Sequence, residues 1–380
     1  MRLIRGSNGW WCITRSGTAL VPDALVHQGK LTDEAMRQLA AAGVGRATAA
    51  RRYRLTVVTA TGCNLGCPYC FQNSAPARPG TFAPPRIAST VLDSGTISEI
   101  VAFAAERAAA AGAPELDVLL FGGEPLLNAA GCLAVLQCCA ARLPTTGGMI
   151  TNGVLLSRAL AVRLAAAGLV SVQVTLDGPR VVHDAVRATR SGRGTFDTVL
   201  ANVAAAQDAT DMAITLRLNL TPAALAGVEE LLDQAAAVLD PARTRFVAAS
   251  LLDYGWGFGD LPASPTAVVR CHALARARGF RIPLPGPAHC DFCSVPGGRL
   301  GAVVNADGTL YSCWESIGRP GREVGTVTTG YADDLGERWT TCGDLAGNTG
   351  ATRRFTDQVD AGLLDLARAG WVGHAAAGGG

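Results

Sequence analysis

The chain has 380 residues, of which 49% are hydrophobic and 17% charged, and its formal net charge at pH 7 is +2. This length fits one large domain with one or two small ones, and the balanced charge gives no reason to expect nucleic acid or an acidic membrane as a partner. No apolar stretch is long enough to span a bilayer, and the N-terminus lacks the pattern of a secretory signal. Twelve cysteines without an export signal indicate metal or redox chemistry in a reducing cytoplasm.

The N-terminal segment has a pattern of its own. Residues 10–19 predict a hairpin with its turn near Ser16 and Gly17, and 32–42 predict a short helix with Thr32 as the N-cap. From residue 54 onward the pattern changes to short apolar strands that alternate with amphipathic helices.

Six strands and five helices make up this alternating part. The predicted strands are 54–60, 117–121, 148–151, 170–176, 213–220 and 244–250. The predicted helices are 96–111, 128–142, 156–167, 195–208 and 222–238. Thr96 to Glu99 has the form of a capping box, and Thr221 offers an N-cap before a proline. This alternation predicts an α/β fold with a parallel sheet, curled by right-handed crossovers into a partial (β/α)6 TIM-like barrel.

The chain after residue 250 is rich in loops and carries a second group of cysteines. An aromatic and glycine-rich loop, 254–259, follows the sixth strand, and 303–311 predict a hairpin with a tight Asp307-Gly308 turn. We therefore expect a small N-terminal segment, the barrel, a cysteine-rich extension and a C-terminal helix with a flexible tail. The boundaries that we assign to these four regions are 1–50, 51–250, 251–345 and 346–380.

Three cysteines follow the first strand in the spacing C-x3-C-x2-C: Cys63, Cys67 and Cys70. A structural zinc site takes four protein ligands, whereas a four-iron cluster held by three cysteines leaves one iron open to a ligand. A zinc knuckle or three buried thiols remain the alternatives. Polar or glycine-rich runs also end the next three strands, at 121–125, 151–153 and 175–178. In barrels of this kind these strand ends meet at one pocket mouth.

These motifs together resemble the radical S-adenosylmethionine enzymes, over roughly residues 54–315. The resemblance rests on the cysteine loop, on Gly-Gly-Glu-Pro after the second strand, and on Thr-Asn-Gly and Thr-Leu-Asp-Gly after the next two. The run from Asp177 through His183 and Asp184 to Arg187 narrows it to the branch with a SPASM or twitch-like extension, which contains peptide and sulfatase maturases. The resemblance implies a [4Fe-4S] cluster with S-adenosylmethionine on its open iron, as the source of a 5′-deoxyadenosyl radical.

The resemblance also assigns cofactor contacts to individual residues. Those residues are Tyr69, Gly122, Gly123, Glu124, Thr175 and Arg187. The glycines and Glu124 would line the methionine amino group, Thr175 would contact the cofactor, and Tyr69 would lie beside the adenine. Arg187 would pair with the cofactor carboxylate, because a guanidinium fork matches that group. An ordinary structural role remains the alternative for Thr175 and Arg187, and His183 with Asp184 can simply cap the next helix.

A second iron–sulfur site is expected in the extension. Its predicted ligands are Cys290, Cys293 and Cys313, with Cys342 or the substrate as the fourth. Zinc at the same site, or thiols without a metal, are the alternatives. The remaining cysteines are expected to pack as small apolar residues. These are Cys12, Cys132, Cys138, Cys139 and Cys271.

The leading functional hypothesis is a cytoplasmic maturase that crosslinks, oxidises or epimerises a residue of a ribosomally made precursor peptide. A reductant such as ferredoxin or flavodoxin would supply the electron, and residues 1–50 can offer a strand edge to a peptide leader. The alternatives are a dehydrogenase or mutase acting on a small molecule, a sulfatase-maturase-like formation of formylglycine, and a non-catalytic iron–sulfur carrier. The sequence identifies no catalytic base.

Overall fold

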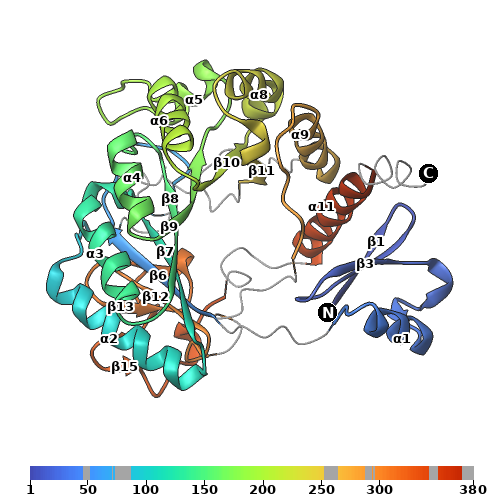
Figure 1. Cartoon of the computed structure of the whole chain (residues 1–380), viewed down its shortest axis with the longest axis horizontal. Helices are drawn as coiled ribbons and strands as arrows, with labels where there is room; N and C mark the ends of the chain where they lie inside the picture. The colour runs from blue at the N-terminus through green and yellow to red at the C-terminus, as the bar shows by residue number, and fades with distance from the viewer. Residues whose placement is uncertain are drawn as a thin grey trace, which may run out of the picture.

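The structure is a computed structural model. It describes residues 1–45, 52–70, 72, 87–251, 264–286, 293, 296–341 and 350–369. A curved sheet with helices along its outer side forms the larger part, and the N-terminal sheet lies beside it (Figure 1). Among the described helices, none combines the length and the apolar character that a bilayer crossing requires.

Six parallel strands form the barrel part of the sheet and follow one another in chain order. They are β6 (Arg52–Ala60), β7 (Glu115–Gly122), β8 (Thr145–Thr151), β9 (Leu169–Thr175), β10 (Ala213–Leu220) and β11 (Thr244–Ser250). All six predicted strands are therefore confirmed, and so is the α/β class with a partial TIM-like barrel. Each strand is joined to the next by one or more helices, as parallel neighbours require.

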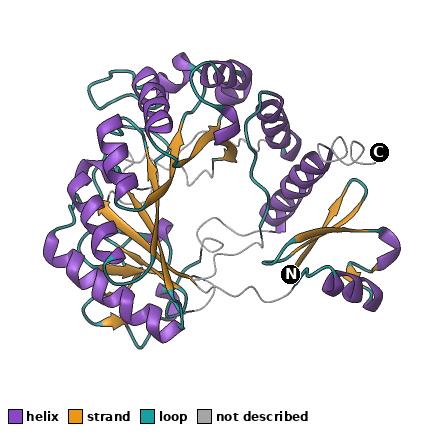
Figure 2. Cartoon of the chain, viewed as in Figure 1, coloured by secondary structure: helices purple, strands orange, loops and turns teal. Residues whose placement is uncertain are grey.

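The helices cover the outer face of this sheet (Figures 1 and 2). They are α2 (Ser94–Ala111), α3 (Ala129–Ala140), α4 (Arg158–Ala166), α5 (Arg180–Val186), α6 (Phe196–Ala209), α7 (Pro222–Ala226), α8 (Val228–Ala236) and α9 (Pro265–Ala277). The five predicted helices are present within a few residues of their predicted ends. The predicted N-cap at Thr221 is confirmed, since its hydroxyl accepts a hydrogen bond from Ala224 N at 3.0 Å.

Two details of the helix predictions are wrong. The capping box at Thr96 does not form, because α2 begins earlier and Asp93 is its N-cap, accepting from Thr96 N at 2.9 Å. The single helix predicted over 222–238 is two helices that meet at Gly227. A side chain at Gly227 would collide with the ring of Pro179. Gly227 therefore allows the break between the two helices to pack closely against the loop before α5.

The cysteine-rich extension continues the barrel sheet. The strand β12 (Gly301–Val304) pairs in parallel with β6, and β13 (Thr309–Tyr311), β14 (Glu323–Thr326) and β15 (Gly330–Tyr331) add antiparallel strands beyond it. The predicted hairpin over 303–311 is confirmed. Its turn closes with Gly308 N donating to Asn305 O at 3.0 Å, and Gly308 has φ +82°, a value that favours glycine.

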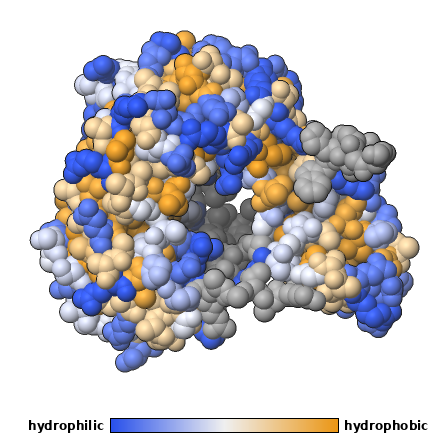
Figure 3. Space-filling view, viewed as in Figure 1, coloured by the Kyte–Doolittle hydropathy of each residue, from blue (hydrophilic) through white to orange (hydrophobic). Residues whose placement is uncertain are grey.

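The two faces of the barrel sheet differ in polarity. On β10, Ile214, Leu216 and Leu218 are buried in the core against the helices. Arg217 and the other residues that alternate with them lie on the opposite face of the strand. These alternate residues belong to the concave face, which carries no helix in the described part of the chain. The space-filling view shows the molecule hollowed at its centre, on this side of the sheet (Figure 3).

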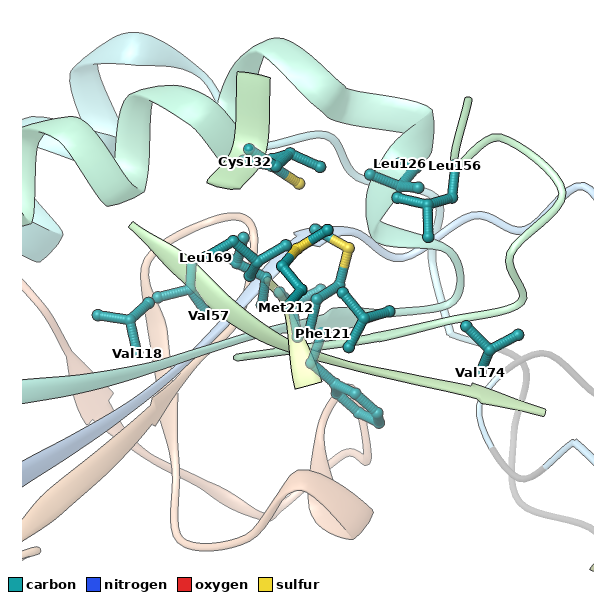
Figure 4. Packing of buried hydrophobic residues seen from close by; sticks show 14 of the residues in the cluster. Val57, Val118, Phe121, Leu126, Cys132, Leu156, Leu169, Val174 and Met212 are labelled. Atoms are coloured by element: carbon teal, nitrogen blue, oxygen red, sulfur yellow. The ribbon is translucent and has the colours of Figure 1, made fainter. Parts of the chain in front are cut away.

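The main hydrophobic core lies between the sheet and its helices. Cys132 of α3 and Leu126 lie over sheet residues such as Val57 and Val118, as the close view shows (Figure 4). Each of these four side chains is at most 4% exposed. This layer of buried apolar side chains holds the strand ends in place, and the polar loops of the concave side begin at these ends.

The N-terminal segment is a three-stranded antiparallel sheet of β1 (Arg2–Gly6), β2 (Gly9–Ile13) and β3 (Thr18–Val21). The short strands β4 (Val26–His27) and β5 (Lys30–Leu31) then lead into α1 (Asp33–Ala41). The predicted hairpin and helix are confirmed, and Thr32 accepts from Ala35 N at 3.2 Å as the N-cap.

Each face of the N-terminal sheet is covered by one helix. The helix α1 packs on the face of Cys12 and Val21, and α11 (Gly350–Ala369) packs on the face of Ile4, Trp11 and Ile13. Arg2 fixes α11 further, donating to Asp357 Oδ1 at 3.0 Å and pairing with Asp360. The first strand and the last described helix therefore share one small core. The sequence did not indicate this contact.

Candidate active site

The cysteine loop leaves β6 at the carboxyl edge of the sheet. Cys63, Cys67 and Cys70 are partly buried, and they lie close enough that the charges of the other two raise the pKa of Cys63. Burial is the larger cause and brings that pKa to about 11. The backbone N–H of Leu65 donates to the Cys63 sulfur at 3.4 Å, and Asn152 Nδ2 lies 3.7 Å from it.

This donor set fits an iron–sulfur cluster. Hydrogen bonds to a ligand sulfur are among the features that tune such clusters, and both donors are already in place around Cys63. Among the described residues, no three histidine, cysteine or acidic side chains converge on a site for a single metal ion. A four-iron cluster does not need that convergence, because each cysteine binds a different iron.

The two glycines after β7 allow the backbone to approach the cysteine loop. A Cβ at Gly122, which has φ +143°, would collide with the carbonyl oxygen of Ala60, and one at Gly123 with those of Thr61 and Gly62. Gly123 N instead donates to Ala60 O at 3.0 Å, and Glu124 N donates to Gly62 O at 2.9 Å. The glycines therefore join the second strand end to the loop that carries the cysteines.

The Glu124 side chain is fully buried and is occupied by protein donors. Its carboxylate accepts from Thr151 Oγ1 at 2.7 Å, from Asn152 N at 2.7 Å and from Leu126 N at 3.0 Å. Burial raises the pKa of this carboxyl, and the three hydrogen bonds oppose that change. The side chain thus ties β7 to β8, which leaves the backbone of Gly122 to Glu124 as the part that can meet a ligand.

Tyr69, Asp177 and Arg187 come together from three segments. The Tyr69 hydroxyl donates to the Asp177 carboxylate, and Arg187 Nη1 donates to the Tyr69 oxygen and lies 3.3 Å from Asp177 Oδ2. Burial raises the pKa of Tyr69, so its phenol keeps the proton that it donates. Arg187 Nε is buried without a hydrogen-bond partner in the described part of the chain. This unused donor fits an acceptor such as the cofactor carboxylate, the predicted partner of Arg187.

His183 connects the two ends of the segment from Asp177 to Arg187. Asp177 N donates to His183 Nδ1 at 3.2 Å, so the ring proton sits on Nε2, which lies 3.1 Å from Thr195 Oγ1. The Thr195 hydroxyl in turn donates to Arg187 O at 2.7 Å. Burial lowers the pKa of His183 to about 4, and the Arg187 charge adds to this effect.

Asp184 has the structural role that the sequence left open. Its Oδ1 accepts from Thr195 N at 2.7 Å and from Phe196 N at 2.9 Å, at the start of α6. Thr175 is buried at the end of β9, and its register partner on β10 is Arg217. The cofactor contact expected of Thr175 stays a prediction.

Two of the four cysteines expected at the second cluster lie outside the described residues, namely Cys290 and Cys342, as does the loop 254–259. Cys293 and Cys313 are both buried. Cys313 directly follows the hairpin, and the ring of its neighbour Trp314 lies 5.4 Å from that of Phe121 on β7. The extension thus meets the barrel beside the strand that carries the glycines, while the ligand set stays a prediction.

Among the remaining cysteines, four are buried as expected and one is not. The buried ones are Cys12, Cys132, Cys139 and Cys271. Cys138 is exposed on α3, because its position on the helix faces away from the sheet.

Asn152 had no predicted role, although it belongs to the Thr-Asn-Gly run after the third strand. Its amide donates to Asn64 Oδ1 at 2.7 Å and so holds the cysteine loop against the end of β8. Arg190 was also missed, and its Nε donates to Cys63 O at 3.1 Å. A polar residue directly after a buried strand was the available signal for Asn152, whereas nothing local marks Arg190.

Comparison with known proteins gives the family. Residues 57–232 match the model of the radical SAM superfamily. Residues 57–232 are a radical SAM domain. The chain is therefore an enzyme of the radical SAM type, a class that implies a [4Fe-4S] cluster and S-adenosylmethionine. None of the curated proteins matches the sequence.

Two solved radical SAM structures share the fold. Native anSMEcpe with bound AdoMet and a Kp18Cys peptide is 16% identical, with a TM-score of 0.55 over 80% of this chain and 82% of that chain. SuiB of Streptococcus suis bound to S-adenosylmethionine is 13% identical, with a TM-score of 0.51 over 88% of this chain and 89% of that chain. At these identities the likeness shows the fold.

Proposed function

We propose that this radical SAM enzyme modifies a ribosomally made precursor peptide by crosslinking, oxidation or epimerisation. The observation that carries the proposal is the N-terminal sheet, in which β3 pairs with β2 and with no other described strand. An unpaired strand edge can take an extended peptide by main-chain hydrogen bonds. Support also comes from anSMEcpe, which has the same fold and has been solved with a bound Kp18Cys peptide.

The residues of this chain have distinct roles in the proposed reaction. Cys63, Cys67 and Cys70 hold the cluster, and Asn152 orients the first of these sulfurs. The chemistry that the cluster and S-adenosylmethionine supply when bound is the abstraction of hydrogen from carbon. The free Nε of Arg187 is the donor for the carboxylate of the cofactor.

The backbone of Gly122 to Glu124, at the end of β7, is the part that we assign to the methionine amino group. Tyr69 joins the cysteine loop to Asp177 and Arg187, so the cluster ligands and the cofactor donor are held as one unit. We assign the second cluster to Cys290, Cys293 and Cys313, with Cys342 or substrate completing the set. A ferredoxin or flavodoxin of the cytoplasm is the proposed electron donor.

The proposal is tested with anaerobically reconstituted full-length enzyme, S-adenosylmethionine, reductant and the peptide encoded by any short reading frame found beside the gene. The expected result is 5′-deoxyadenosine together with a peptide that has lost two hydrogens, or that has gained deuterium from heavy water. The same peptide without its leader should react more slowly, because it cannot occupy the β3 edge. Formation of 5′-deoxyadenosine with an unchanged peptide would instead favour a small-molecule substrate.

A further inference from the structure

Arg217 is a charged residue on the concave face of the barrel, and the roles described so far do not use it. It lies on β10 between Thr175 of β9 and Val247 of β11, which are its register partners. It is half-buried, and its Nε donates to Asn219 Oδ1 at 2.9 Å. The backbone N–H of Asn219 donates to Asp177 Oδ1 at 3.1 Å, so this pair adjoins the site.

Arg217 has no ion-pair partner among the acidic side chains of the described structure. Its two cross-strand neighbours are uncharged, and no described acid forms a salt bridge with it. Asp177 is the carboxylate whose charge acts on Arg217, but Asp177 already pairs with Arg187. Two guanidinium groups therefore share one carboxylate. Burial lowers the pKa of Arg217 and the Arg187 charge adds to this, whereas the Asp177 charge opposes both.

The donors that remain on Arg217 form a fork. Its Nε is held by Asn219, and neither Nη nitrogen has a hydrogen-bond partner among the described residues. Held by its inner nitrogen, the planar guanidinium presents two parallel N–H groups, the geometry that matches a carboxylate. Because no described helix packs on this side of β10, the fork lies on the concave side of the sheet.

We propose that Arg217 binds a carboxylate of the substrate, and that Asn219 sets the orientation of its guanidinium. The inference rests on the proposed function and adds that the peptide presents an acidic group close to the modified residue. That group is either an aspartate or glutamate side chain or the C-terminal carboxylate. Arg187, which is adjacent to Cys67 and has an unused Nε, serves the cofactor, so the two arginines recognise different carboxylates.

A direct test uses phenylglyoxal, which modifies accessible arginines, with mass-spectrometric mapping of the site. Glutarate should protect Arg217 of the holoenzyme at least fivefold when S-adenosylmethionine is also present, and glutaramide should not. Arg245, an exposed arginine on the neighbouring strand β11, should react equally in all samples. Full protection by S-adenosylmethionine alone would assign this arginine to the cofactor. Equal protection by glutaramide, or none by either compound, would also overturn the proposal.

A second test separates this inference from the proposed function. With a peptide that the wild type modifies, R217Q and R217K should raise KM at least tenfold, whereas R245Q should not. Replacing each acidic residue of the peptide by its amide, and the C-terminus by its amide, should reveal one peptide whose KM no longer depends on Arg217. A peptide that wild type modifies with a KM independent of Arg217 refutes the inference alone. A peptide that is never modified refutes the proposed function, and the phenylglyoxal result still decides the role of Arg217.

Discussion

His183 should give the protein a pH-dependent stability that the substitution His183→Gln removes. The ring is buried and neutral, with Nδ1 accepting from Asp177 N, so a second proton would face that N–H group. In the unfolded chain the histidine has its ordinary pKa near 6.5, whereas burial lowers the pKa to about 4 in the folded protein. The unfolded state therefore binds the proton first as the pH falls.

The size of the effect follows from this pKa difference. Each unit of pKa difference corresponds to 1.36 kcal/mol, so the neutral ring contributes about 3 kcal/mol to the free energy of unfolding at neutral pH. This contribution is fully lost only at pH 4 and below. Above pH 6.5 this contribution hardly changes with pH, and at pH 5 about 2 kcal/mol of it has been lost. A chain of 380 residues has an unfolding entropy of about 0.8 kcal/mol per degree, so this loss equals about 2 to 3 °C in Tm.

The assay is anaerobic thermal unfolding of wild type and His183→Gln at pH 7.5 and pH 5. The variant should be the less stable protein at pH 7.5, because it breaks the hydrogen bonds to Asp177 and Thr195. The difference in Tm should then shrink by about 2 to 3 °C at pH 5, since the variant has no ring to protonate. His27→Gln on the exposed strand β4 is the control and should follow wild type. A difference that is the same at both pH values would refute the buried neutral ring.

Three further substitutions test other contacts. Gly123→Ala should lower the iron bound per chain at least twofold, because its Cβ would collide with two carbonyls, whereas Gly66→Ala in the same loop has open space and should bind normally. Asn152→Ala should speed cluster loss to a chelator severalfold, and an unchanged rate would contradict its contact with the first cysteine sulfur. Arg2→Gln should destabilise the packing of α11 on the N-terminal sheet by about 1 kcal/mol and raise the hydrogen exchange of α11. Arg5→Gln removes only an exposed ion pair and should leave this exchange unchanged. Equal exchange of α11 in the two variants would contradict the contact.

The sequence was sufficient for the barrel because its signals are local. Each strand of the barrel is a short apolar run with a polar or glycine-rich end, and the carboxyl ends of parallel strands meet wherever the sheet lies. The cysteine loop and the runs after β7, β8 and β9 were therefore brought together as predicted. Helix starts were predicted less well, since Asp93 and Thr96 are both residue types that cap helices and α2 begins after the first of them.

What the sequence could not indicate are contacts between distant segments. The pairing of β12 with β6 joins residues far apart in the chain, and no local pattern specifies a partner strand. The hydrogen bond from Tyr69 to Asp177 likewise depends on how two loops meet. Arg217 looked like an ordinary strand residue, because its missing counterion becomes visible only once Asp177 is seen to pair with Arg187.

The shared core of the N-terminal sheet and α11 has a consequence for synthesis in the cell. Ile4, Trp11 and Ile13 are made before the barrel, whereas the helix that covers them is made after it. Their apolar face therefore stays exposed to water while the barrel, which lies between the two segments in the sequence, is synthesised and can already form. The sheet should thus become fully ordered only once α11 has emerged from the ribosome, and any fusion that pulls α11 away should disturb the first strand.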